Sequence, residues 1–201
     1  MEAFDLIRHS ARIRHAEARA KAGGIQTAAG LLDGATGLTG VGRQAVPDDD
    51  PLLCGAEAVL DRSTPAIFYK QSVGAAEAAF YQAHEFGHYW LNSATGACAA
   101  GEIDESMPEE RMPLGIQRVE GYGPRERREC QANVFAREFL LPATEARRLF
   151  LDERLAATAI AQWLGVPLGM VHQQLALALL VPEVESAEQT GPRISPPLDD
   201  S

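Results

Sequence analysis

The sequence has no apolar run long enough to cross a membrane. The longest one near the C-terminus, residues 175–181, is far shorter than the roughly 20 residues that a transmembrane helix needs. The N-terminal residues MEAFDLIRHS lack the apolar stretch of a secretory signal. We therefore expect a soluble, cytoplasmic protein that does not bind membranes.

Cysteine is scarce. Cys54, Cys98 and Cys130 form neither a CxxC pair nor the spacing of a zinc knuckle. In a reducing compartment such thiols stay free, so the sequence predicts no disulfide framework.

Basic residues are outnumbered, with 18 Lys and Arg against 28 Asp and Glu and a net charge of −10. An acidic surface repels phosphate backbones, so we expect no direct binding of nucleic acid by this segment. The exception is a basic stretch at helical spacing, which we interpret as a solvated helix face: Arg8, Arg12, Arg14, Arg19 and Lys21.

The remaining composition is that of a globular domain, with 201 residues of which 46% are hydrophobic. We expect residues 1–24 to form an amphipathic helix that ends at Gly23-Gly24, and residues 25–181 to form the main domain. Residues 182–201 are rich in Pro, Glu and Ser, a composition that predicts a disordered tail or linker. Residues 92–124 are rich in Gly, Pro and acidic residues and read as a flexible insert or a lid.

The spacing of apolar residues along the chain predicts an α+β, mainly helical fold. Short strands are expected at 41–46, 56–60 and 66–70, with 34–51 otherwise a loop. Helices are expected at 4–21, 27–32, 75–91, 125–141, 143–152, 153–164 and 170–180. The helix 75–91 should lie beside the small sheet, and the last helices should form a C-terminal helical pair.

The strongest indication of a chemical function is an HExxH motif on the predicted helix 75–91, with the sequence His84-Glu85-Phe86-Gly87-His88. Residues i and i+4 share a helix face with Cβ atoms about 5–6 Å apart, so His84 and His88 can bind one zinc ion. Glu85 is offset from that face and is free to accept a proton from the attacking water as general base.

Catalytic zinc sites usually have three protein ligands, so a third must come from elsewhere. No histidine follows at metal-binding spacing, which points to a carboxylate. Glu129 on the helix 125–141 is the leading candidate because Ala132 and Ala136 would let two helices approach, and Glu126 and Glu138 compete with it.

The paired motifs resemble the ImmA/IrrE family of bacterial metallopeptidases. The resemblance rests on Ala83 to His88, then Glu129-x-x-Ala132-Asn133-x-Phe135-Ala136 and Phe139-Leu140-Leu141-Pro142, within residues 25–180. It implies a small helical zinc peptidase in which Glu129 is the third zinc ligand. It further implies a protein substrate such as a helix-turn-helix repressor in a stress or defence response. The interval between His88 and Glu129 is longer than the family pattern.

Other residues are weaker candidates. Asn133, one turn after Glu129, is expected either to orient that carboxylate or to pack as an ordinary amide. Tyr81, Tyr89 and Tyr122 are candidate donors to the oxyanion, although packing is the commoner role of tyrosine. If the strand 66–70 lies at a sheet edge, it could hold substrate by strand addition.

Two further features concern partners. The helices 153–164 and 170–180 resemble a helix-turn-helix, but the second lacks basic residues, which favours packing or protein docking over DNA reading. Residues 196–201 (PPLDDS) resemble the segment before the first nucleotide-binding motif of UvrD-like helicases, which suggests a downstream helicase domain in a longer chain.

Two alternatives to an active peptidase remain. One is a regulatory or partner-binding module, attached to a DNA-processing protein, whose retained zinc site is covered by residues 92–124. The other is a deformylase-like amidase, which requires a Gly-Cys-Leu context that the sequence Leu53-Cys54-Gly55 does not provide.

Overall fold

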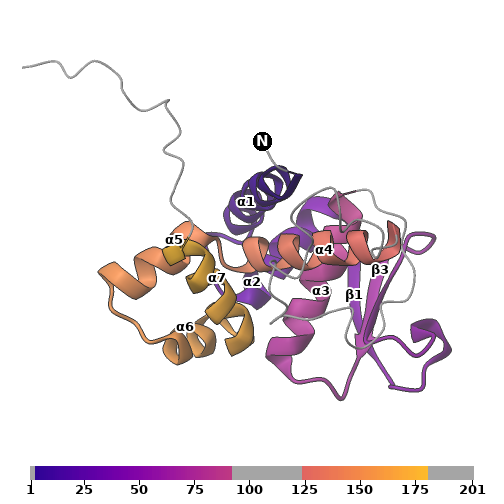
Figure 1. Ribbon diagram of the computed structural model, residues 1–201. Coiled ribbons are helices and arrows are strands. Elements are labelled where there is room, and N and C mark those ends of the chain that lie inside the picture. Colours follow the sequence, from indigo (N-terminus) through magenta and orange to yellow (C-terminus); the bar gives the residue numbers. More distant parts are fainter. Residues whose placement is uncertain (1–2, 92–123, 181–201) are drawn as a thin grey trace, which may run out of the picture.

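The computed structural model describes residues 3–91 and 124–180. A three-stranded sheet occupies one side of the molecule, and helices form the remainder (Figure 1). The fold is therefore α+β and mainly helical, as the sequence predicts. Within these two ranges, no helix combines the length and apolarity that crossing a membrane requires.

The sheet has the order β1-β3-β2, which puts β3 (Ala66–Lys70) in the centre. β1 (Gly42–Val46) pairs with it in parallel and β2 (Ala58–Asp61) pairs antiparallel. Residues 66–70 could hold substrate by strand addition only at a sheet edge, and this condition is not met, because both sides of β3 are already paired. The edges belong to β1 and β2, since pairing order depends on contacts that a single strand's sequence does not encode.

The two faces of the sheet differ in what covers them. Ile67 and Leu60 point into the main core with the helices. On the other face Phe68 packs with Val46 and with Leu53 of the short helix η1 (Pro51–Leu53) in a small second cluster. The alternation follows from the period of two in a strand, and it directs one face toward the HExxH helix.

That helix, α3 (Ala75–Trp90), packs along α4 (Pro124–Leu140). The approach is close at Gly87, where an added Cβ would lie 3.2 Å from the carbonyl oxygen of Ala132 and 3.3 Å from its Cα. Gly87, inside the motif, and the small Ala132 therefore let the two backbones come together at the level of the histidines.

α1 (Ala3–Lys21) and α2 (Ala28–Thr39) pack on each other, and α1 also lies along α4. α2 is longer than the predicted 27–32, because Gly34 is not a loop residue. A Cβ at Gly34 would lie 2.0 Å from the carbonyl oxygen of Ala18, so this glycine lets α1 and α2 touch. The helix ends at Gly40, whose φ of 73° is left-handed.

The basic residues of α1 are not merely solvated. Arg12 Nη1 lies 2.9 Å from Glu138 Oε1, and Arg14 lies over the Trp90 ring at 5.9 Å from its centroid. His15 Nδ1 is 2.7 Å from the carbonyl oxygen of Phe139. The interpretation of this stretch as a solvated face is thus only partly correct, since these side chains fasten α1 to α3 and α4.

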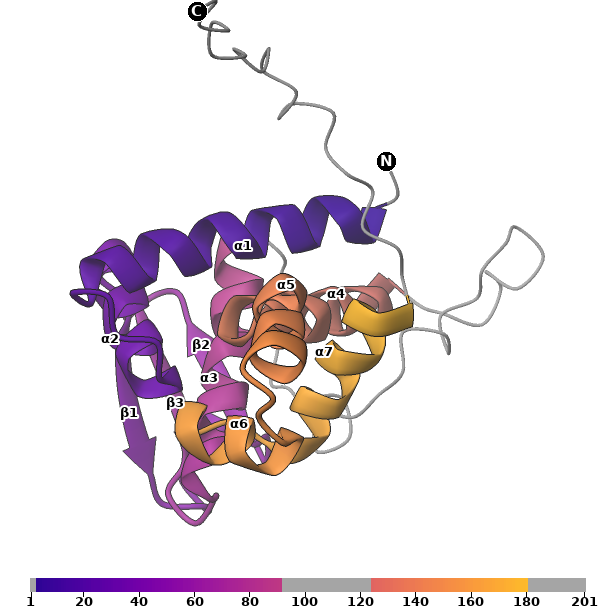
Figure 2. The same cartoon turned by 90° about the vertical axis from the view of Figure 1, so that its left-hand side faces the viewer.

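The C-terminal helices lie at the end of the molecule away from the sheet (Figures 1 and 2). The predicted helix 143–152 is α5 (Ala143–Arg147) continued by a π-helical turn, Arg148–Asp152. The expected pair is present as α6 (Ala157–Leu164) and α7 (Leu168–Leu180). α6 begins later than the predicted residue 153, because Arg154 has a φ of 57° and interrupts the helix.

Candidate metal centre

The candidate centre lies where α3 meets α4. His84 and His88, one turn apart on α3, are 0% and 1% exposed. The sequence predicts them beside the buried face of this helix, yet every residue from Gln82 to His88 is buried. The second half of α3 is covered all round because α4 and the sheet pack on it from different sides.

Three ligand-type atoms converge there. His84 Nε2 and His88 Nε2 are 3.0 Å apart, and Glu129 Oε2 lies 3.2 Å from each of them. Tetrahedral zinc with bonds of about 2.0–2.1 Å needs ligand atoms about 3.3–3.4 Å apart. The triangle is therefore close to the spacing that a metal ion would require, and the residues fit one.

A hydrogen bond directs one of these nitrogens. His84 Nδ1 lies 2.9 Å from Asn133 Oδ1, and an amide oxygen can only accept. The proton of His84 therefore sits on Nδ1, so that Nε2 presents its lone pair to the triangle. The sequence left two roles open for Asn133, orienting the Glu129 carboxylate or packing as an ordinary amide, and this bond adds a third, orienting His84.

The charge of the triangle also suits a cation. Burial would raise the pKa of Glu129, but the hydrogen bonds and positive charge of His84 and His88 outweigh it and hold that pKa well below its usual range. Glu129 is thus a carboxylate at neutral pH. A carboxylate oxygen and two imidazole nitrogens this close need positive charge between them, supplied by protons or by a metal ion.

The motif glutamate, Glu85, is 0% exposed and lies beside this triangle. One ligand atom from each of His84, Glu85 and His88 falls within 4.8 Å of the others, so these side chains could hold a metal ion. Glu85 Oε2 accepts a hydrogen bond of 3.0 Å from the backbone N–H of Leu60, while Oε1 has no partner within the described ranges. A buried carboxylate oxygen without a partner is costly, which marks Oε1 as the atom left for a further ligand.

The edge strand β2 thus reaches the centre through its backbone. Lys70 N donates to Glu57 O, so in this antiparallel pair the N–H of Leu60, three residues on, faces away from β3. Arg62, just beyond β2, donates from Nη2 to the carbonyl oxygen of His88 at 2.9 Å. Neither contact was foreseen, because a backbone donor and a turn arginine leave no motif in a sequence.

The competing glutamates lie elsewhere. Glu126 is exposed in the first turn of α4. Glu138 is buried, but it accepts hydrogen bonds from Arg12 and from Gln174. Of the three candidates on this helix, Glu129 is therefore the one that reaches the two histidines.

Two of the three tyrosine candidates lie in the part of the chain that the structure describes. Tyr81 and Tyr89 are half-buried and pack against the main core, and Tyr89 also meets the edge of Trp90. Tyr122 lies outside the described residues. The predicted insert or lid at 92–124 lies outside them as well, apart from Pro124, and so does the predicted tail 182–201.

Among the residues that the structure describes, no cysteine belongs to the group that could hold a metal ion. Cys54 is exposed, far along the sequence from the motif. Cys130 follows Glu129 directly, but burial raises the pKa of its thiol, against a smaller opposing effect of Arg137. A neutral buried thiol is a poor nucleophile.

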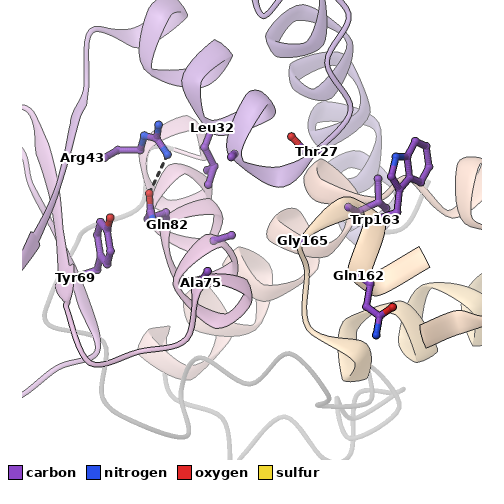
Figure 3. Close-up of a pocket in the computed structure, with 12 residues that line it drawn as sticks. Thr27, Leu32, Arg43, Tyr69, Ala75, Gln82, Gln162, Trp163 and Gly165 are labelled. Atoms are coloured by element: carbon purple, nitrogen blue, oxygen red, sulfur yellow. Dashed lines mark hydrogen bonds between the residues drawn. The ribbon is translucent and has the colours of Figure 1, made fainter. Parts of the chain in front are cut away.

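A pocket of about 310 Å³ lies on a different side of α3 (Figure 3). Arg43 donates there to Thr36 and, at 3.0 Å, to Gln82 Oε1, and it is paired with Asp33. Gln82 and His84 are two positions apart, about 200° around the helix. We therefore assign Arg43 a structural role, linking β1 to α2 and α3 through these contacts, and not a role in the metal centre.

No protein-family model matches the chain, and neither a curated protein nor a solved structure matches it. Function is therefore inferred from the motif and from the geometry around it.

Proposed function

We propose that this chain is a zinc-dependent endopeptidase of the kind that the ImmA/IrrE resemblance implies. The observation that carries the proposal is the buried triangle of His84, His88 and Glu129 next to a buried glutamate with one oxygen unpartnered. Two imidazoles and one carboxylate form the ligand set of known zinc peptidases, and zinc suits nitrogen and oxygen donors in tetrahedral geometry.

Zinc held there would act as a Lewis acid that polarises the scissile carbonyl and makes water more acidic. Glu85 performs the proton transfers. Its Oε2 is anchored by the Leu60 N–H, so that Oε1 can accept a proton from the attacking water. As the C–N bond breaks, the same oxygen can return the proton to the nitrogen, which then leaves as a neutral amine.

The edge strand β2 is the element suited to holding the substrate. Its outer backbone groups face away from β3 on the side where Glu85 lies. A substrate in extended conformation could pair by strand addition with outer groups of this edge other than the Leu60 N–H, which already donates to Glu85, and present its peptide bond to that carboxylate. This replaces the role that the sequence suggested for residues 66–70.

The wider setting follows from the resemblance. We propose a protein regulator, such as a helix-turn-helix repressor, as substrate, in a cytoplasmic stress or defence response. The proposal involves no direct nucleic-acid contact by this segment, whose net charge is −10.

The experiment is a comparison of the wild type with Glu85→Gln, which keeps the size of the side chain but cannot act as a base. Each protein is loaded with zinc and incubated with a library of peptides from a proteome digest, and new N-termini are identified by mass spectrometry. We expect the wild type to generate new N-termini, and Glu85→Gln to bind as much zinc without generating them. Glu126→Gln, an exposed change on α4, is the control with wild-type cleavage.

Two outcomes would refute the proposal. If Glu85→Gln cleaves as the wild type does, the activity belongs to a contaminant or to another site. If the wild type binds zinc but cleaves nothing, the regulatory module with a retained metal site is the better interpretation.

A further inference from the structure

His88 lies in the last turn of α3. An α-helix leaves its last four carbonyl groups without an intrahelical partner, and helix ends open locally more often than helix interiors. α3 ends at Trp90, so the carbonyl of His88 is one of these four. His84 lies one turn earlier, and Asn133 also holds its ring through Nδ1. One of the two histidines of the candidate centre is therefore carried by the end of its helix.

An arginine from a different element contacts this helix end. Arg62, in the turn after β2, donates from Nη2 to the carbonyl oxygen of His88 at 2.9 Å. An arginine can satisfy a carbonyl that the helix leaves without a partner, and its positive charge is favourable at the negative end of the helix dipole. The contact therefore stabilises the last turn of α3 at the residue that carries a ligand nitrogen.

The turn that carries Arg62 is itself fixed. Asp61, the last residue of β2, accepts at Oδ1 from the backbone N–H of Ser63 at 2.8 Å and from its hydroxyl at 2.7 Å. These bonds hold the pKa of the Asp61 carboxyl below its usual range, so it is an acceptor at neutral pH. Just before this turn, the N–H of Leu60 donates to Glu85. β2 and its turn therefore contact the HExxH helix at two points.

We propose that Arg62 is a positioning residue for the metal centre. By holding the carbonyl of His88, it keeps Nε2 of this side chain in place relative to the other two ligands. This role rests on the zinc site of the proposed function. Ligands that are held in place beforehand bind a metal more tightly, because less freedom is lost on binding. Asn133 and Arg62 then have parallel roles, one on the ring of His84 and the other on the backbone of His88.

The hydrogen bond and the charge of Arg62 have opposite effects on zinc binding. The hydrogen bond is partly buried, and we expect its loss to raise the dissociation constant for zinc about three- to tenfold. The positive charge of the guanidinium repels a metal cation, so its loss alone would strengthen binding. The direction of the change therefore distinguishes the two effects, and positioning predicts weaker binding without Arg62.

The experiment compares zinc affinity in three variants of the full chain, by chelator competition on protein stripped of metal. Arg62→Met has a long side chain that cannot donate, and should raise the dissociation constant about three- to tenfold. Arg62→Lys keeps a donor and a charge and should recover part of the affinity. Arg43→Met is the matched control, because Arg43 also contacts α3, at Gln82 on a different side of the helix (Figure 3), and should bind zinc as the wild type does. Circular dichroism verifies that each variant folds.

A second measurement needs no metal. Hydrogen exchange of the stripped protein, read by mass spectrometry in peptides from the end of α3, reports how often its last turn opens. Leu91 N donates to the carbonyl oxygen of Gly87 at 2.9 Å and is the amide to follow. We expect it to exchange about three- to tenfold faster in Arg62→Met and at the wild-type rate in Arg62→Lys. A general loss of stability would instead raise exchange throughout the protein.

Three results would overturn the proposal. Zinc binding in Arg62→Met as tight as in the wild type, or tighter, would show that this contact does not position His88 for a metal. Equal weakening in Arg62→Met and Arg43→Met would assign Arg62 a role in overall stability only. A wild type that binds no zinc would refute the proposed function as well, whereas the first two results leave that function standing.

Discussion

Replacing Asn133 by leucine should weaken zinc binding without touching a metal ligand. Asn133 and His84 are both buried, at 1% and 0% exposure, and their hydrogen bond measures 2.9 Å. Asn133→Leu keeps the size of the side chain and leaves the Nδ1–H of His84 without that acceptor.

The loss of zinc-binding free energy in Asn133→Leu can be worked out in two ways. A buried donor that loses its partner costs about 1–3 kcal/mol. Loss of the group that orients a ligating histidine typically lowers metal affinity by about 10- to 100-fold, equivalent to about 1.4–2.7 kcal/mol. The two ranges agree, so we expect the dissociation constant for zinc to rise by one to two orders of magnitude.

The assay is competition with a chromogenic zinc chelator at neutral pH, starting from protein stripped with EDTA. Asn133→Asp is the informative companion, because a carboxylate at this position accepts the same hydrogen bond and should preserve or strengthen zinc binding. Gln131→Leu, another amide on α4, is the control. Wild-type zinc affinity in Asn133→Leu would show that Asn133 does not orient His84 toward a metal.

Three further predictions concern stability. Gly87→Ala should destabilise the fold by about 1–3 kcal/mol in urea titrations, because the new Cβ would crowd the Ala132 backbone. Gly37→Ala in α2 is the control and should be neutral or stabilising, because only the flexible Lys21 side chain lies near that position. Burial lowers the pKa of His15 despite its bond to the Phe139 carbonyl, so protonation favours the unfolded chain. Stability should therefore fall as the pH drops below about 6.5, and a flatter pH dependence is expected of His15→Gln. Zinc at 100 times its dissociation constant should stabilise the protein by about 2.7 kcal/mol, seen as a higher melting temperature that EDTA reverses.

Local sequence patterns predicted most elements but not how they meet. The strand 66–70 and the helix 75–91 follow from alternation and periodicity, and the structure confirms both. Gly34 was misread as a loop residue because a glycine required by helix packing looks like one required by a turn. The central position of β3 could not be predicted from the sequence either, because strand order depends on pairing between distant segments.

In the candidate site, too, the local motif could be predicted from the sequence, whereas the contacts between distant segments could not. HExxH is a local pattern, so His84, Glu85 and His88 were identifiable from spacing alone. Glu129 was one of three carboxylates on its helix. The small Ala132 and Ala136 favoured it weakly and the resemblance favoured it more strongly, before the 3.2 Å contacts were seen. The anchoring of Glu85 by Leu60 involves a backbone N–H, which every non-proline residue has, so no side-chain pattern could reveal it.

Crystals grown with zinc provide the most direct measurement, through an anomalous difference map at the zinc absorption edge. We predict a single peak within about 2.0–2.2 Å of His84 Nε2, His88 Nε2 and a carboxylate oxygen of Glu129, with the fourth position open to solvent. A peak that excludes Glu129, or a fourth ligand supplied by the chain itself, would contradict an active zinc peptidase at this centre.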